Sequence, residues 1–174
     1  MKQCDLLIKN CSILTPDFQI RKDCSVAVSD TRICQVGDAR TVNAEWQGKE
    51  VIEAEGNLLM PGFVDGHTHT CQQLLRGRTA DEYPMIWTRF LVPFESSLSP
   101  EDVRASARLH CVEMIKAGIT SFADAGGVHM EEVAEAAVET GMRAAICPAT
   151  MDMGNVVCGE MTRCTQDCIR GTED

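Results

Sequence analysis

One apolar run that ends in a pair of histidines constrains the fold of this chain more than any other segment. Residues 58–66 (Leu-Leu-Met-Pro-Gly-Phe-Val-Asp-Gly) lead directly into His67-Thr68-His69. In a β-strand, residues i and i+2 point to the same face, so the two imidazoles would share one space. A divalent metal needs such convergent ligands. Because the histidines come where the run ends, the pattern is typical of an α/β barrel, which keeps its chemistry at its strand ends.

The His-x-His spacing alone is a weak signal. Four histidines in a chain of 174 residues give one such pair by chance roughly 7% of the time, and an exposed or core-satisfied pair would look the same. The context favours a metal site, because Pro61-Gly62 precedes the strand and Asp65 lies two residues before His67. We therefore interpret His67 and His69 as metal ligands.

The hydrophobic pattern of the chain changes at Pro61. Before it, short alternating segments separated by turn signals predict a small β-sandwich. The strands of that part are expected at 5–14, 24–28, 32–36 and 50–53. After it, strands alternate with helices, which predicts βα units and a parallel sheet. The strands of this second part are expected at 62–67, 119–123 and 143–147.

Two helices and a long loop are expected between the strands of the second part. Ser99 and Pro100 mark a helix start, since serine is a good cap and proline suits the first turn, and Gly118 marks the helix end. A second helix is expected at 130–140. The loop at 68–98 is rich in aromatic residues, so we expect it to pack as short helical pieces.

Composition excludes several classes of protein. The net charge of −10 argues against a nucleic-acid partner, which would require clustered Lys and Arg. The sequence contains no run of 18 apolar residues, so no membrane span is expected, and the N-terminus lacks the features of a signal peptide. The ten cysteines form no Cys-x-x-Cys pair, so we expect reduced thiols in a cytoplasmic protein rather than a disulfide framework.

Residues 59–69 resemble the first barrel strand of the amidohydrolase superfamily. Trp87 and four further segments strengthen the resemblance, at 74–77 (Leu-Leu-Arg-Gly), 92–95 (Val-Pro-Phe-Glu), 98–103 and 120–124. Together they are similar to the branch of methylthioadenosine/S-adenosylhomocysteine deaminases, guanine deaminases and triazine hydrolases. The resemblance implies a partial β/α (TIM-like) barrel over 61–174, the first three βα units, preceded by an incomplete β-sandwich over 1–60.

The resemblance also implies an activity. A metal-dependent aminohydrolase of this branch deaminates a heterocyclic amine, such as a purine, a purine nucleoside or a pterin, through a metal-activated water. Zinc is the first expectation for the metal and iron the alternative. Hydrolytic dehalogenation is the main alternative reaction. The expected partner is thus a small heterocyclic substrate, with no nucleic acid and no membrane, and a homo-oligomer is one option for the full-length enzyme.

Three residues are candidates for substrate binding. Glu95 matches the glutamate that accepts hydrogen bonds from ribose hydroxyls in nucleoside deaminases, with a solvated loop carboxylate as the alternative. Trp87 would line the same pocket or anchor the loop in a core. His129 follows the second strand, where it would lie at the barrel mouth or cap the next helix.

Other polar residues near the motifs have structural alternatives. Asp65 would orient a histidine or serve a loop, and Asp124 would approach the site or form a turn. Arg76 belongs to a matching motif or pairs with an acid, and His110 is expected to be structural. Pro148 stands where the adenosine-type deaminases place an arginine that helps hold a substrate carboxylate, which argues against S-adenosylhomocysteine as the substrate.

The family's remaining histidines, its acid/base glutamate and its last aspartate ligand have no counterpart here, so no catalytic residue is assigned in this chain. A complete barrel needs eight strands and about 250 residues. The chain therefore resembles an N-terminal fragment, and we expect the 174 residues alone to bind metal weakly and to be inactive. A catalytically inactive truncated product is the alternative to an active longer enzyme.

Overall fold

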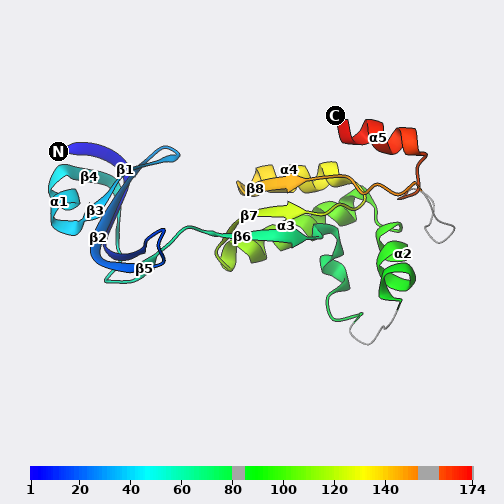
Figure 1. Ribbon diagram of the computed structural model, residues 1–174, viewed down its shortest axis with the longest axis horizontal. Coiled ribbons are helices and arrows are strands. Elements are labelled where there is room, and N and C mark those ends of the chain that lie inside the picture. Colours follow the sequence, from blue (N-terminus) through cyan, green and yellow to red (C-terminus); the bar gives the residue numbers. More distant parts are fainter. Residues whose placement is uncertain (80–84, 153–160, 174) are drawn as a thin grey trace. The chain divides into compact units, whose positions relative to one another are not determined.

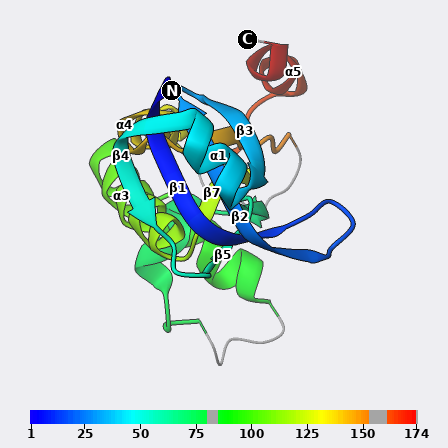
Figure 2. The ribbon, with the colours of Figure 1, turned by 90° about the vertical axis from the view of Figure 1, so that its left-hand side faces the viewer.

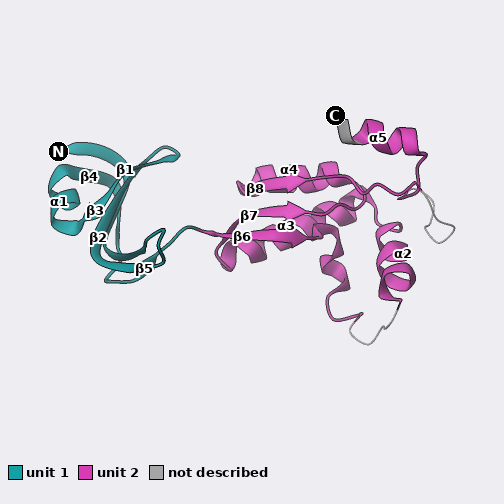
Figure 3. Ribbon diagram, in the orientation of Figure 1, with its two compact units in different colours: residues 1–61 teal, residues 62–174 magenta. Residues whose placement is uncertain are grey.

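The computed structural model describes residues 1–79, 85–152 and 161–173. The chain divides into two compact units at Pro61, residues 1–61 and residues 62–174 (Figure 3). Each unit has its own sheet.

The first unit is a five-stranded sheet with one short helix (Figure 1). Its elements are β1 (Lys2–Leu14), β2 (Ile20–Ser29), β3 (Arg32–Asp38), α1 (Ala39–Glu45), β4 (Trp46–Glu53) and β5 (Leu58–Leu59). The strand order is β3-β2-β1-β4, and β5 also pairs with β1. β1 runs antiparallel to β2 and parallel to β4. Figure 2 shows β1 and β2 as a long, bent hairpin that extends beyond the other strands.

The helix α1 corrects the expectation that residues 1–60 contain strands alone. Asp38 caps it, since its carboxylate accepts hydrogen bonds from the backbone N–H groups of Arg40 and Thr41. Ala39 and Val42 are buried, and Val42 joins a small core with Leu7. A helix of seven residues is too short for a clear 3.6-residue period in the sequence. The described strands of this unit form one sheet, and its assignment as an incomplete sandwich stays a prediction.

The second unit is built on three parallel strands in the order β6-β7-β8. Its elements are β6 (Phe63–Thr68), η1 (Thr70–Leu75), η2 (Trp87–Leu91), α2 (Val92–Glu95), α3 (Pro100–Lys116), β7 (Ile119–Asp124), α4 (Met130–Thr140), β8 (Arg143–Ile146) and α5 (Thr165–Glu173). Helices α3 and α4 lie on the same face of this sheet (Figure 1). The strands, both long helices and the short helical pieces of the 68–98 loop follow the sequence prediction.

The ends of α3 and α4 are set by local chemistry. Ser99 and Asp102 form a reciprocal capping box at the start of α3, with Pro100 in its first turn. Gly118 and Gly141 follow the two helices with φ of +80° and +72°, a conformation that glycine adopts without steric cost. These signals fix the start of α3 and the ends of both helices, and so the points at which β7 and β8 begin.

One apolar core holds the helices against the sheet. Val103, Ala107, Cys111 and Met114 of α3 are buried in it, together with Phe122 of β7. The 3.6-residue spacing of the apolar residues predicts one buried stripe on α3 that includes Ile115, but Ile115 is 49% exposed. Met130, Val133 and Ala136 of α4 belong to the same core, which therefore packs both helices against β7.

The nine cysteines that the structure describes are all free, as expected, and six of them are buried. Burial, with a smaller contribution from the carboxylates of Glu95 and Asp124, raises the pKa of the Cys71 thiol to about 12. A metal site of Cys158, Cys164 and Cys168 would have a spacing that matches no common zinc pattern, and Cys158 lies outside the described residues. Among the described helices, none is both long and apolar enough to cross a membrane.

The contribution of the capping box to the stability of this unit can be tested directly. Ser99→Ala removes the hydroxyl that accepts from the Asp102 N–H, so the free energy of unfolding should fall by about 1 kcal/mol. Urea titration followed by circular dichroism measures the change. Ser97→Ala, which removes an exposed hydroxyl outside the cap, is the control, and equal losses in both variants would contradict the role of the cap.

Candidate functional site

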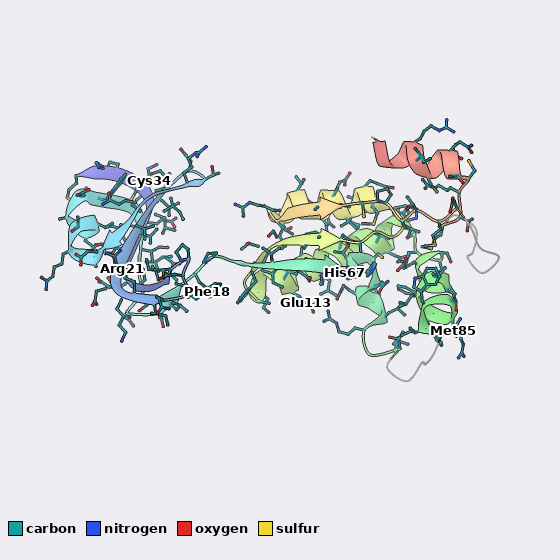
Figure 4. All side chains as sticks on the ribbon, in the orientation of Figure 1. Phe18, Arg21, Cys34, His67, Met85 and Glu113 are labelled. Carbon is teal, nitrogen blue, oxygen red and sulfur yellow. The ribbon has the colours of Figure 1, made fainter. Side chains whose placement is uncertain are left out.

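The two histidines lie together at the carboxyl end of β6, where Figure 4 labels His67. Their ring centroids are 5.2 Å apart, and the ring planes are nearly perpendicular, at 84°. His67 is exposed and His69 is half-buried. The strand thus brings the two imidazoles side by side, as its alternation requires.

A backbone carbonyl fixes the orientation of one of these rings. His69 Nδ1 lies 3.0 Å from the carbonyl oxygen of Gly126. Because a carbonyl oxygen can only accept, Nδ1 must carry the proton, and in the neutral ring Nε2 keeps its lone pair. Metal-binding histidines commonly use their second nitrogen in this way. The arrangement leaves Nε2 of His69 available as a ligand.

Two threonines alternate with the histidines and are buried. The Thr68 hydroxyl lies 2.9 Å from Nε2 of His110 on α3. The Thr70 hydroxyl donates to Oδ2 of Asp124 at 2.6 Å. His110 thus contacts the residue that lies between the two histidines. The threonines therefore hold the strand end by hydrogen bonds on the face opposite to the histidines.

Asp124 is almost fully buried at the end of β7. Its Oδ2 also accepts the backbone N–H of Thr70 at 3.0 Å, and its Oδ1 accepts the backbone N–H of Gly126 at 3.0 Å. This residue both closes a local turn and reaches the segment that carries His69. Asp65 has a more local role, since its Oδ1 accepts the backbone N–H of His67 at 3.2 Å.

A hollow of about 380 Å³ brings His69 together with two of the three candidate substrate residues, Trp87 and Glu95. Trp87 is half exposed, so it is a wall residue and not a buried anchor of the loop. His67 and His69 line an adjoining hollow of about 360 Å³ with Arg76. The region around the histidines can therefore accept a small molecule.

Glu95 is buried, which differs from the alternative of a solvated loop carboxylate. Its Oε1 accepts a hydrogen bond from Nε2 of Gln72. Burial raises the pKa of Glu95, while the Gln72 hydrogen bond and the nearby His69 oppose that rise. Gln72 had no signal in the sequence, because its role depends on η1 packing beside α2.

His129 lies apart from the hollow that holds His69. Its Nε2 contacts the carbonyl oxygen of Leu98 at 3.2 Å, and its side chain makes no capping hydrogen bond to α4. It lines a different hollow of about 180 Å³, with Arg163 and Glu131. Pro148 borders both hollows, through the chain that follows β8.

Arg76 forms an ion pair with an acidic residue, which was one of the two alternatives expected for it. Its guanidinium donates to both oxygens of Glu113, at 2.7 and 2.6 Å, and also bonds Gln73. Figure 4 labels Glu113 on α3. The Arg76 side chain is 60% exposed and that of Glu113 is 38% exposed, so solvent screens the pair, which joins the loop to α3 and contributes little energy.

The donor set fits a divalent metal in kind but supplies only two ligands. Imidazole nitrogens suit zinc and iron, and the His69 tautomer leaves the right atom available. Among the described residues, no group of three or more histidine, cysteine or acidic side chains could hold a metal. Catalytic zinc sites use three protein ligands, so this site needs a further ligand.

Residues 58–171 match the model of the amidohydrolase family. The chain belongs to that family, and the prediction made from residues 59–69 is confirmed.

Curated relatives and solved structures agree with this. The chain is 36% identical over 159 residues to a 5'-deoxyadenosine deaminase of Methanosarcina acetivorans, covering 90% of this chain and 36% of that protein. It is 37% identical over 149 residues to a 5-methylthioadenosine/S-adenosylhomocysteine deaminase of Moorella thermoacetica, covering 82% and 33%. A crystal structure of an adenosine deaminase from Xanthomonas campestris with bound zinc superposes with a TM-score of 0.81 at 25% identity, covering 97% of this chain and 38% of that one. The partial β/α barrel is confirmed, and the chain spans about a third of the length of the curated relatives it matches.

The contact of His110 predicts a pH dependence of stability. Burial lowers the pKa of His110, outweighing three carboxylates that favour the charged ring. Its folded-state pKa is thus below the unfolded value, so its contribution to stability is present above a pH of about 6.5 and is lost as the pH falls through the folded-state pKa. Wild type should lose more unfolding free energy between neutral and mildly acidic pH than His110→Gln does.

Urea titrations at a series of pH values measure this difference. His129→Gln is the control, because it removes a histidine of the same unit that does not contact the strand end. Parallel pH profiles for wild type and His110→Gln would contradict the assignment.

Proposed function

We propose that this chain forms the first part of the barrel of a metal-dependent aminohydrolase. The observation that carries the proposal is one hollow in which a metal-competent histidine, His69, faces a buried carboxylate, Glu95, and an aromatic wall, Trp87. The named relatives, which are deaminases of adenosine-type nucleosides, support a purine nucleoside or a related heterocyclic amine as substrate.

His67 and His69 would hold the metal, with zinc favoured because the Xanthomonas campestris structure contains it. When bound, such a metal supplies a water activated at neutral pH for hydrolysis. The chain's own residues prepare the site: Gly126 keeps the proton on Nδ1 of His69, and the buried threonines hold the strand end.

Glu95 would accept hydrogen bonds from sugar hydroxyls of the substrate. Its carboxylate is held by Gln72 and borders the hollow, so a substrate hydroxyl would meet an oriented acceptor. Trp87 would cover a flat ring, as aromatic walls of ligand pockets do. His129 lines the second hollow, and we keep it as a contact for a substrate group extending past Pro148.

We also propose that residues 1–60 are part of a β-sandwich and residues 61–174 part of the barrel, supported by the division of the chain at Pro61. A cytoplasmic location is supported by the free thiols of the nine described cysteines, which a reducing compartment maintains.

Metal binding tests the first step of this proposal. Zn²⁺ titrated into the untagged 174-residue chain should bind weakly, and His67→Ala and His69→Ala should each weaken binding by more than about tenfold, since a ligand matters at least as much as its supporting contacts. His129→Ala should bind as wild type does. Calorimetry with Zn²⁺ measures all four proteins, and equal binding by wild type and both ligand variants would reject the two histidines as the site.

Activity is tested in a chimera, because two ligands are too few for turnover. This chain would replace the matching third of the Methanosarcina acetivorans 5'-deoxyadenosine deaminase. The chimera should release ammonia from purine nucleosides, and the 174-residue chain alone should not. A folded, zinc-loaded chimera that releases no ammonia would overturn the proposal, and chloride release from a chlorinated triazine would support a dehalogenase instead.

The role of Glu95 is tested in the same chimera. Glu95→Gln should raise KM for a nucleoside by about tenfold to a hundredfold, the value of a hydrogen bond to a charged group, with little change for the free base. Steady-state kinetics on nucleoside and base give the comparison. Glu101→Gln, at an exposed position in the first turn of α3, is the control, and an unchanged KM for Glu95→Gln would remove Glu95 from the substrate site.

A further inference from the structure

The carboxylate of Asp124 is connected to His69 along two separate routes. Through Oδ2 it accepts both the backbone N–H and the hydroxyl of Thr70, the residue directly after His69. Through Oδ1 it accepts the backbone N–H of Gly126, whose carbonyl oxygen bonds Nδ1 of His69. One side chain thereby holds both the backbone beside His69 and the acceptor of its ring proton.

Three donors bond the two carboxylate oxygens of Asp124, so each oxygen accepts at least one hydrogen bond. Its side chain is 3% exposed, and water contributes little to its solvation. An asparagine in its place would have one acceptor oxygen and one NH₂ group. That NH₂ group would face a donor, either at Thr70 or at Gly126, and one of the two routes would be lost.

The second route passes through Gly126, a position whose backbone conformation and close neighbours suit glycine alone. Its φ is +101°, and a Cβ there would lie 2.9 Å from the backbone nitrogen of Ala149. Glycine is therefore required at this position, because the backbone of Ala149 occupies the space that a side chain would need. Only the Asp124 carboxylate bonds the N–H of this glycine among the contacts of the described residues.

We propose that Asp124 is a positioning residue of the metal site, which sets the tautomer and orientation of His69 through Thr70 and Gly126. The effect of Asp124 on Zn²⁺ binding rests on the proposed metal site, whereas its effect on the His69 tautomer does not. It assigns to Asp124 a role beyond that of a turn former, and it predicts two separable losses when the carboxylate is removed.

The test is Asp124→Asn, with the 174-residue chain studied by NMR. Long-range ¹H–¹⁵N correlations of the imidazoles, at a pH above the usual histidine pKa of about 6.5, report which nitrogen carries the proton. His69→Gln assigns the signals. Wild type should show a single Nδ1–H tautomer for His69, and Asp124→Asn should show a mixture of both tautomers. Zn²⁺ affinity should fall by about tenfold or more, as for other residues that support a metal ligand.

The chain contains a closely matched control. Asp102 accepts hydrogen bonds through one oxygen from the N–H and hydroxyl of Ser99, just as Asp124 does from Thr70. Asp102→Asn makes the same change of carboxylate to amide on the same unit, away from the histidines. It should leave the His69 tautomer and the Zn²⁺ affinity unchanged.

Each outcome is decisive. A single, unchanged His69 tautomer in folded Asp124→Asn overturns the proposal. If that variant does not fold, Thr70→Val decides, because it removes one donor and keeps the backbone contact. It should change the orientation of the His69 ring, read from the NOE contacts of its ring protons, and Thr70→Ser should restore them. Unchanged contacts in Thr70→Val overturn the proposal. If wild type binds no Zn²⁺ at the histidines, the proposed function fails, and the tautomer still decides the role of Asp124.

Discussion

The alternation of side chains along β6 is the constraint on which the rest of the site depends. Histidines and threonines alternate from His67 to Thr70, so one face of the segment carries the imidazoles and the other carries the hydroxyls. The hydroxyl face is buried against α3 and β7, where His110 and Asp124 receive it. A shift of one residue in register would exchange the two faces, placing both imidazoles in the core and removing the site.

Local signals in the sequence were sufficient for much of the second unit. Ser99, Pro100 and Gly118 delimit α3, and Gly141 ends α4, because caps and left-handed glycines act within a few residues. The short helix α1 was missed, since seven residues show too little periodicity against the surrounding strands. Ile115 was wrongly placed in the core, because periodicity alone does not give the exact edge of a buried stripe.

The candidate site was only partly predictable for a different reason. His67 and His69 were found because their relation is local, two residues along one strand. The partners of Thr68 and Thr70 lie 42 and 54 residues further along the chain, so they emerge only when α3 and β7 are packed. Burial of Glu95 and its contact with Gln72 likewise depend on how the loop folds back. The sequence placed Asp124 at a strand end, where it could approach the site, without indicating Thr70 as its partner.

The carbonyl of Gly126 links the chemistry of the motif to the order in which the chain folds. β6 is synthesised well before residue 126, yet His69 cannot have this hydrogen bond until β7 has paired with β6 and the following turn has formed. On the ribosome, a nascent chain that exposes the histidines early carries them with either tautomer, as free imidazoles do. The oriented His69 ring is therefore a product of the second βα unit, and at the proposed metal site the capture of a metal in the native geometry would follow that folding step.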